Sequence, residues 1–213
     1  MKRFATGLLV TAMVIAVVWS SWNELSKLDY ARIPTRASWQ LPARVIEALD
    51  IDKGDRLADI GAGEGYFTLR LADAVGVTGR VYAVEVDEHI ADNLERWVQG
   101  HDADNVDVVL GEFDDPRLPD HGVDLVFLCN TYHHIERRTD YFARLRADLR
   151  PGGRVAVIDM RADLTGIARL FATSGHWMDR ADLLGEMELA GYRHLRSFDF
   201  LPVQVFEVFA PAE

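Results

Sequence analysis

The sequence of 213 residues contains a single cysteine, Cys129, and its 23 lysine and arginine residues are outnumbered by 34 aspartate and glutamate residues. One cysteine cannot form an intramolecular disulfide or a zinc or iron–sulfur site built from several thiolates. Because the formal net charge is −11, we expect no general affinity for nucleic acid. Apolar residues make up 49% of the chain, which excludes intrinsic disorder as its main state.

Long apolar runs are also scarce, and the exception is residues 4–22, which carry no charge. As a helix they would extend roughly 28 Å at ~1.5 Å per residue, close to the ~30 Å hydrocarbon core of a bilayer. We therefore interpret residues 1–22 as a transmembrane signal anchor that attaches the chain to a membrane by a single pass. The alternative is a signal peptide, cleaved after export. Basic residues flank the run on both sides, so the side of the membrane that holds the remaining chain stays open.

Residues 23–40 are polar and mixed in charge, as expected of a juxtamembrane linker, and residues 41–213 alternate between strand and helix patterns. We predict strands at 56–62, 80–86, 106–110, 123–129, 154–160, 193–200 and 204–210. We predict helices at 42–51, 66–75, 88–98, 139–149 and 178–191. This order is typical of an α/β fold, a doubly wound, Rossmann-like and mainly parallel seven-stranded sheet. The two successive strands at the end indicate one antiparallel strand near the C-terminus. The fold also includes an apolar N-terminal helix, residues 4–22, which precedes this domain in the sequence.

A glycine-rich loop follows the first predicted strand, with the sequence DIGAGEG at residues 59–65. Glycines let the backbone turn tightly and approach a ligand without a Cβ atom in the way. Glu85 ends the next strand, 24 residues beyond Gly61, where a carboxylate can bind both hydroxyls of a ribose. The alternative is a plain strand–helix turn with a solvated Glu85.

With these features the sequence resembles the class I S-adenosylmethionine-dependent methyltransferases over roughly residues 40–210. The resemblance rests on five segments in the family's order and spacing: DIGAGEGYF (59–67), VYAVEVDE (81–88), GEFDDPRLP (111–119), VDLVFLCNTYHHI (123–135) and LRPGGRVAVIDM (149–160). It implies the fold and the cofactor S-adenosylmethionine.

The resemblance also implies roles for individual residues. The methionine part of the cofactor would be held by Asp59, Gly61, Gly63 and Gly65. Glu85 would bind the ribose, Asp87 would lie at the adenine edge, and Glu112 would contact the adenine amino group. Asn130 would lie over the amino-acid end of the cofactor.

The loop after the fourth strand suggests the kind of acceptor. Many amino-methylating members of the family carry a proline-rich aromatic tetrapeptide that starts at the position of Asn130, whereas this sequence has two histidines, His133 and His134. A histidine can take a proton from a hydroxyl, a thiol or an acidic carbon while that group attacks the methyl carbon. His133 is the preferred base because it lies nearer the strand end. The alternative is that both histidines shape the pocket by packing or hydrogen bonding.

We therefore expect a methyltransferase that acts on an oxygen or carbon of a small, membrane-associated acceptor, without a metal ion and without nucleic acid as a partner. The alternative is an exported or membrane-anchored binding or scaffold protein that keeps the fold but does not methylate. The sequence leaves the oligomeric state open.

Overall fold

The computed structural model describes residues 35–163 and 177–212. The chain divides into one unit of residues 1–38 and a second unit of residues 39–213, and the sheet belongs to the second. The apolar helix predicted for residues 4–22, and most of the linker predicted for 23–40, lie outside the described residues. Within the described part of the chain, no helix is long and apolar enough to cross a membrane.

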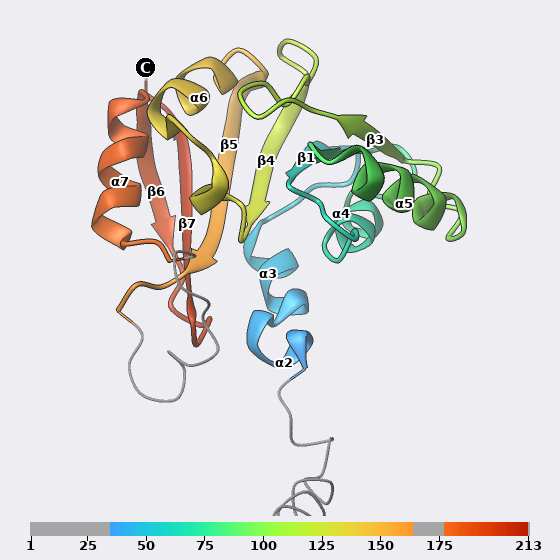
Figure 1. Cartoon of the computed structure of the whole chain (residues 1–213), viewed down its shortest axis with the longest axis horizontal. Coiled ribbons are helices and arrows are strands. Elements are labelled where there is room, and N and C mark those ends of the chain that lie inside the picture. Colours follow the sequence, from blue (N-terminus) through green and yellow to red (C-terminus); the bar gives the residue numbers. More distant parts are fainter. Residues whose placement is uncertain (1–34, 164–176, 213) are drawn as a thin grey trace, which may run out of the picture. The chain divides into compact units, whose positions relative to one another are not determined.

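Seven strands form one sheet in the order β3-β2-β1-β4-β5-β7-β6 (Figure 1). The strands are β1 (Arg56–Ile60), β2 (Arg80–Glu85), β3 (Val106–Leu110), β4 (Val123–Cys129), β5 (Leu149–Met160), β6 (Tyr192–Ser197) and β7 (Gln204–Pro211). Strands β1 to β5 run parallel, and β7 is antiparallel to both of its neighbours. The predicted mainly parallel sheet with one antiparallel strand near the C-terminus is confirmed.

Helices cover both faces of this sheet, as Figure 1 shows. One face packs against α3 (Pro42–Ala48), α4 (Thr68–Val75) and α5 (Glu88–Gln99), and the other against α6 (Arg138–Leu145) and α7 (Arg180–Leu189). The central strand β4 alternates between the two cores, with Phe127 in the first and Leu128 in the second, both fully buried. This two-residue alternation explains its unbroken apolar sequence.

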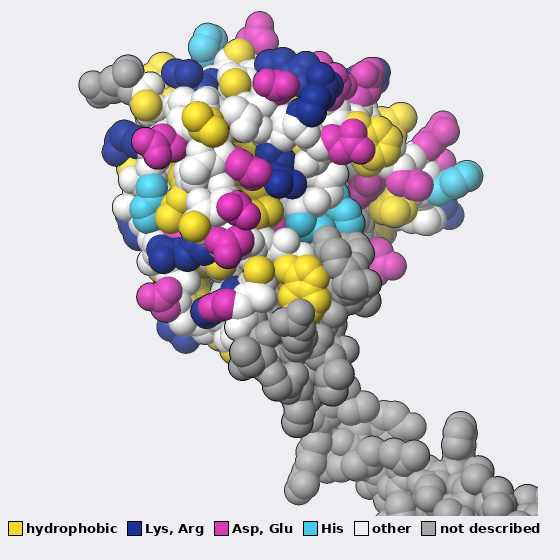
Figure 2. Space-filling view, turned by 60° about the vertical axis from the view of Figure 1, so that its left-hand side comes forward, with side chains coloured by type: hydrophobic (Ala, Val, Ile, Leu, Met, Phe, Trp, Pro, Cys, Tyr) yellow, Lys and Arg dark blue, Asp and Glu magenta, His cyan; other side chains and the backbone are white. Residues whose placement is uncertain are grey.

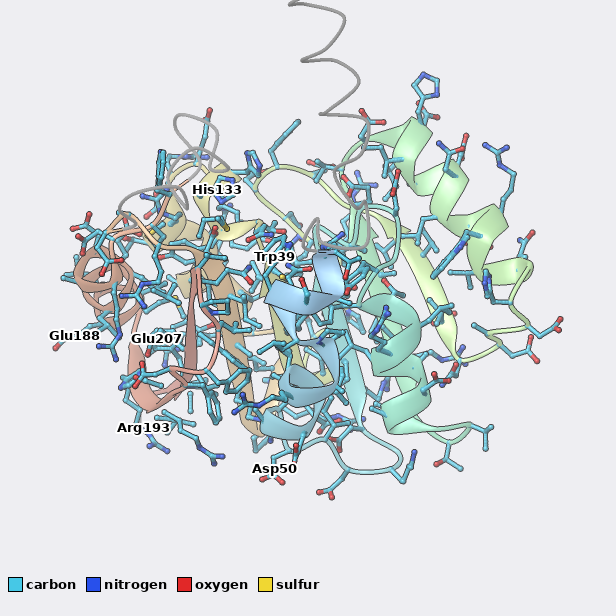
Figure 3. The ribbon with its side chains drawn as sticks, turned by 90° about the horizontal axis from the view of Figure 1, so that it is seen from below. Trp39, Asp50, His133, Glu188, Arg193 and Glu207 are labelled. Atoms are coloured by element: carbon cyan, nitrogen blue, oxygen red, sulfur yellow. The ribbon has the colours of Figure 1, made fainter. Side chains whose placement is uncertain are left out.

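The order of the strands reverses between β1 and β4, which lie side by side although helices and two strands separate them in the sequence. In open parallel sheets, ligands bind outside the carboxyl ends of the strands at such a switch point. In Figure 1 the arrowheads of β4 and β5 point to the lower edge, and Figure 3 views the sheet from that end.

The boundaries differ from prediction in a few places, each for a local reason. The helix predicted for 139–149 ends at Leu145, because Leu149 already pairs with Val123 as the first residue of β5. The strand predicted for 193–200 ends at Ser197. Two short helices, α2 (Arg36–Gln40) and the 3-10 helix η2 (Tyr132–His134), are not predicted, because segments this short show no amphipathic period.

Candidate active site

The glycine-rich loop lies at the switch point, directly after β1. Gly61, Gly63 and Gly65 all have positive φ angles, of 73°, 55° and 78°. The backbone N–H groups of Gly61 and Ala62 both donate to the Val84 carbonyl, at 2.9 and 3.0 Å. The loop is thereby attached to the end of β2, in a conformation that residues with a Cβ atom rarely adopt.

The space around each glycine shows what the loop meets. A Cβ atom on Gly65 would lie 2.7 Å from side-chain atoms of Leu94 and Trp97 on α5, so this glycine allows the helix to pack closely. A Cβ atom on Gly61 would lie 2.3 Å from Thr131 Oγ1 in the loop after β4. No atom lies within 4 Å of a Cβ atom built on Gly63, so a ligand can approach the backbone at this position.

The carboxylate of Glu85 contacts the loop at this opening. Its Oε2 accepts a hydrogen bond from Gly63 N at 3.0 Å, and its Oε1 accepts from the backbone N–H groups of Val86 and Asp87 at 2.8 and 3.2 Å. The residue is 9% exposed. Its carboxylate is therefore held in one orientation against the glycine-rich loop, and Glu85 and Gly63 are brought together as the sequence predicted.

Two other predicted residues stabilise the elements around the loop. Asp59 is 3% exposed, and its Oδ2 accepts a hydrogen bond from Thr68 Oγ1 at 2.7 Å, which fixes the start of α4 below the loop. Asp87 is the N-cap of α5, where its Oδ1 accepts from the N–H groups of His89 and Ile90 at 2.9 and 3.1 Å. Capping of this kind stabilises a helix by ~1 kcal/mol.

Glu112 is placed differently from these residues. Its side chain is 55% exposed and forms an ion pair with Arg117. The structure therefore does not bring Glu112 together with Glu85 and the glycine-rich loop through a direct contact, but places it in a surface pair with a residue of its own loop.

Asn130 begins the loop after β4 and has a positive φ of 57°. Its backbone N–H donates to the Ile158 carbonyl at 2.8 Å, and its Oδ1 accepts from Gln204 Nε2 at 2.8 Å. The preceding residue, Cys129, accepts a hydrogen bond at Sγ from Gln40 Nε2 at 3.1 Å. Gln40 and Gln204 are 1% and 2% exposed, and sequence reasoning missed both because isolated glutamines carry no motif.

His133 is held by a buried carboxylate at the end of β5. Its Nδ1 lies 2.7 Å from Asp159 Oδ1, and its backbone N–H donates to Asp159 Oδ2 at 3.1 Å. The two side chains are 6% and 0% exposed. His134 is exposed, and its ring centroid lies 4.0 Å from that of His133. Sequence reasoning missed Asp159, although an aspartate within the apolar strand sequence VAVIDM was a signal that could have identified it.

Tyr132 in the same loop is part of the fold rather than a proton carrier. Its hydroxyl donates to Glu186 Oε2 at 2.8 Å, and Arg138 donates two hydrogen bonds to the same carboxylate at 2.7 and 2.8 Å. Burial, and then the hydrogen bond to Glu186, raise the pKa of Tyr132 well above its usual range. The hydrogen bonds from Arg138 lower the pKa of Glu186. The phenol therefore stays protonated and ties η2 to α7.

The loop and its flanking helices also border an open hollow at the surface. A hollow of about 690 Å³ is lined by His133, His134, Glu186 and the segment 135–140, within the usual range for small-molecule sites. Figure 2 shows acidic and basic side chains interspersed over the face of the molecule in that view.

Residues 57–153 match the family model described as a methyltransferase domain. This match, together with the relatives and solved structures below, indicates a class I S-adenosylmethionine-dependent methyltransferase. Among curated relatives of this chain, the 27-O-demethylrifamycin SV methyltransferase of Amycolatopsis mediterranei is 34% identical over 128 residues, which are 58% of the chain and 45% of the relative. The ubiquinone/menaquinone biosynthesis C-methyltransferase UbiE of Ectopseudomonas mendocina is 27% identical over 153 residues, 70% of the chain and 60% of the relative.

Among solved structures, a SAM-dependent methyltransferase from Aquifex aeolicus superimposes on this chain with a TM-score of 0.74, at 22% identity, covering 84% of this chain and 96% of that one. This likeness shows the fold. The chain spans 38% to 60% of the length of the first four curated relatives.

The residues present fit the family's cofactor, S-adenosylmethionine. The open backbone at Gly63 leaves room for a ligand, and the buried carboxylate of Glu85 faces the same loop. Val86 and Ile90 next to it are 38% and 37% exposed, so apolar surface is available beside the carboxylate for a flat ring. The site therefore offers hydrogen-bond acceptors for a ribose and an apolar wall for a base.

Proposed function

We propose that the chain transfers the methyl group of S-adenosylmethionine to an oxygen or carbon of a small acceptor, with His133 as the general base. The observation that carries this proposal is the 2.7 Å contact between His133 Nδ1 and Asp159 Oδ1. A carboxylate that accepts a hydrogen bond from Nδ1–H fixes the tautomer in which Nε2 is the basic nitrogen. For the exposed His134 we propose a place in the wall of the hollow.

The binding part of the mechanism belongs to the glycine-rich loop and Glu85. S-adenosylmethionine, when bound, supplies an electrophilic methyl group. The loop backbone at Gly63 and the carboxylate of Glu85 would fix its position relative to the acceptor. Such alignment can lower the barrier of a two-substrate reaction by ~7–11 kcal/mol in favourable cases, and it requires the rigid contacts that Glu85 makes.

The proton-transfer part belongs to His133. The acceptor oxygen or carbon would bond to the methyl carbon while the methyl–sulfur bond breaks, and the proton of the acceptor would move to His133 Nε2. The carboxylate of Asp159 would stabilise the imidazolium that results. The names of two relatives point in the same direction, because one is an O-demethylrifamycin methyltransferase and the other a C-methyltransferase.

A calorimetric titration of the full chain in detergent micelles tests the proposal. We expect S-adenosylmethionine and its demethylated product to bind with micromolar dissociation constants, after which hydroxylated acceptors can be screened. A folded chain that binds neither compound would contradict the proposal and would favour a non-catalytic scaffold that keeps the fold.

We also propose that residues 4–22 tether the enzyme to a membrane, where an amphiphilic acceptor would be available. The support is their uncharged composition and their length. Alkaline carbonate extraction of membranes that contain the full chain provides the test. Wild-type protein should stay in the pellet, and a Val10→Arg, Val14→Arg double variant should be released, because each arginine near the centre of a span costs ~2.5–3.5 kcal/mol. Release of the wild-type chain would refute the tether.

A further inference from the structure

Gln204, the first residue of β7, is a buried amide next to the candidate active site. It pairs with Met160 at the carboxyl end of β5 and is 2% exposed. Its Nε2 lies 2.8 Å from Asn130 Oδ1 and 3.9 Å from Cys129 Sγ. Both neighbours can accept a hydrogen bond, so the amide is oriented with its N–H₂ group towards the loop after β4.

The other half of this amide is unsatisfied. Within the described part of the chain, no donor lies within hydrogen-bonding distance of Gln204 Oε1, and this atom is buried. Buried polar atoms in folded proteins nearly always have a hydrogen-bond partner. Where the protein supplies none, a water molecule or a ligand usually provides the missing hydrogen bond. The position beside Asn130, at the edge where the parallel strands end, favours a ligand of the active site.

A second cavity, lined by residues other than those of the hollow beside His133, borders Gln204 and has room for part of such a ligand. Its charges restrict the choice. The cavity measures about 190 Å³, and Phe198 and Phe206 contribute apolar wall. Its wall also carries four carboxylates against two arginines, and each arginine is paired with one of the carboxylates: Arg161 with Asp163 at 2.7 Å, and Arg180 with Glu207 at 2.5 Å. An anionic group would therefore meet an excess of negative charge, whereas an uncharged donor would not.

We infer that Gln204 determines acceptor specificity: its Oε1 accepts a hydrogen bond from a hydroxyl group of an uncharged acceptor. This inference rests on the proposed function and narrows its substrate class, because it selects hydroxylated molecules over carboxylates, phosphates and ethers. A water molecule is the alternative partner for Oε1, and an acceptor hydroxyl would replace it with an equivalent hydrogen bond.

Nuclear magnetic resonance of the ¹⁵N-labelled full chain in detergent micelles, saturated with S-adenosylhomocysteine, tests the inference. The probes are two matched pairs, phenol with anisole and cyclohexanol with methoxycyclohexane, which differ in one donor hydrogen. The side-chain amide signals of Gln204, assigned by their loss in a Gln204→Met variant, and those of Asn130 report on binding. We expect dissociation constants two- to tenfold lower for the alcohols than for the ethers, the value of one hydrogen bond.

The variants separate this role from a structural one. In Gln204→Met, the Asn130 signals should no longer distinguish alcohols from ethers. Gln204→Glu, which keeps an acceptor oxygen, should retain the preference for alcohols, and it provides the test if Gln204→Met does not fold. Equal binding of alcohols and ethers to the wild-type chain, or no response of Gln204 to either alcohol, would overturn the inference and leave a buried water as the partner of Oε1. Failure of the wild-type chain to bind S-adenosylhomocysteine would instead overturn the proposed function, so the two failures are distinguishable.

Discussion

His133 Nδ1 lies 2.7 Å from Asp159 Oδ1, and this contact joins the loop after β4 to the end of β5 beneath the protein surface. The aspartate also accepts hydrogen bonds from the backbone N–H groups of His133 and Met160, at 3.1 and 2.7 Å. Three donors thus converge on one carboxylate. The imidazole ring, which belongs to the loop after β4, is therefore attached to the carboxyl end of β5.

Replacement of the base should lower methyl transfer strongly. We expect His133→Asn to reduce kcat for a hydroxylated test acceptor by about 10²–10⁴-fold, the usual contribution of a general base. Asp159→Asn should also reduce kcat while the KM for S-adenosylmethionine changes less than about twofold, because it alters the tautomer and not the cofactor contacts. His134→Asn is the matched control, and a loss equal to that of His133→Asn would contradict the assignment of the base.

Two acidic residues of the predicted cofactor site should differ in their effect on binding. Glu85→Ala should weaken S-adenosylmethionine binding by about 1–3 kcal/mol, since a buried carboxylate that faces the glycine-rich loop would be lost. Glu112→Ala should weaken it less, because Glu112 is exposed and paired with Arg117. Calorimetric dissociation constants of the two variants check this order. A larger effect of Glu112→Ala would show that Glu112 leaves its ion pair when the ligand binds.

The close packing at Gly65 should make an alanine at this position lower the free energy of unfolding. Gly65→Ala places a Cβ atom 2.7 Å from Leu94 and Trp97 at a φ of 78°, and Gly152→Ala has a φ of 84° with no atom within 4 Å. Gly152→Ala should cost about 1–2 kcal/mol for the left-handed backbone alone, and Gly65→Ala should cost at least 1 kcal/mol more because of the clash. Urea unfolding of both variants measures the difference. Equal costs would mean that α5 moves aside without strain.

The stability of the domain should depend on Asp148 between about pH 4 and pH 6. Burial, followed by the nearby carboxylates of Asp115 and Asp120, raises the pKa of Asp148 to about 6. The folded state binds this proton more tightly than the unfolded state. The protonated carboxyl of Asp148 therefore makes its full contribution to the free energy of unfolding below pH 4, and this contribution is lost as the pH rises through 6. Asp148→Asn should therefore be more stable than the wild type by ~1 kcal/mol at pH 7.5, a value reduced for partial exposure, and this gain should vanish near pH 4. Thermal unfolding across this range checks it, and a gain that is independent of pH would refute it.

The sequence predicted the strands of the sheet well, because apolar runs and glycine turns are local signals. The ranges 106–110 and 123–129 agree with β3 and β4, and the antiparallel β7 followed from two successive strands without a helix between them. The predicted end of α6 was wrong. The strand that begins at Leu149 pairs with Val123, 26 positions earlier in the sequence, and such a distant pairing leaves no local signal.

The parts of the candidate site that escaped prediction are those that depend on distant partners. Asp159 becomes meaningful only when β5 places it next to His133, and Gln204 only when the antiparallel β7 returns it to Asn130. Glu112 illustrates the opposite case. Its position after β3 suggested a ligand contact, but Arg117 in the same loop forms an ion pair with it.

The approach of Thr131 to Gly61 links the evolution of two loops. Thr131 Oγ1 and Cγ2 occupy the place where a side chain on residue 61 would begin, at 2.3 and 2.4 Å from a Cβ atom there. Residue 61 therefore has to stay glycine as long as residue 131 has a side chain of the size of threonine. Substitutions of Thr131 by smaller residues do not create this clash. A randomised library of this loop should recover small residues at position 131 most often, and variants with new acceptors should arise first at the exposed position 134.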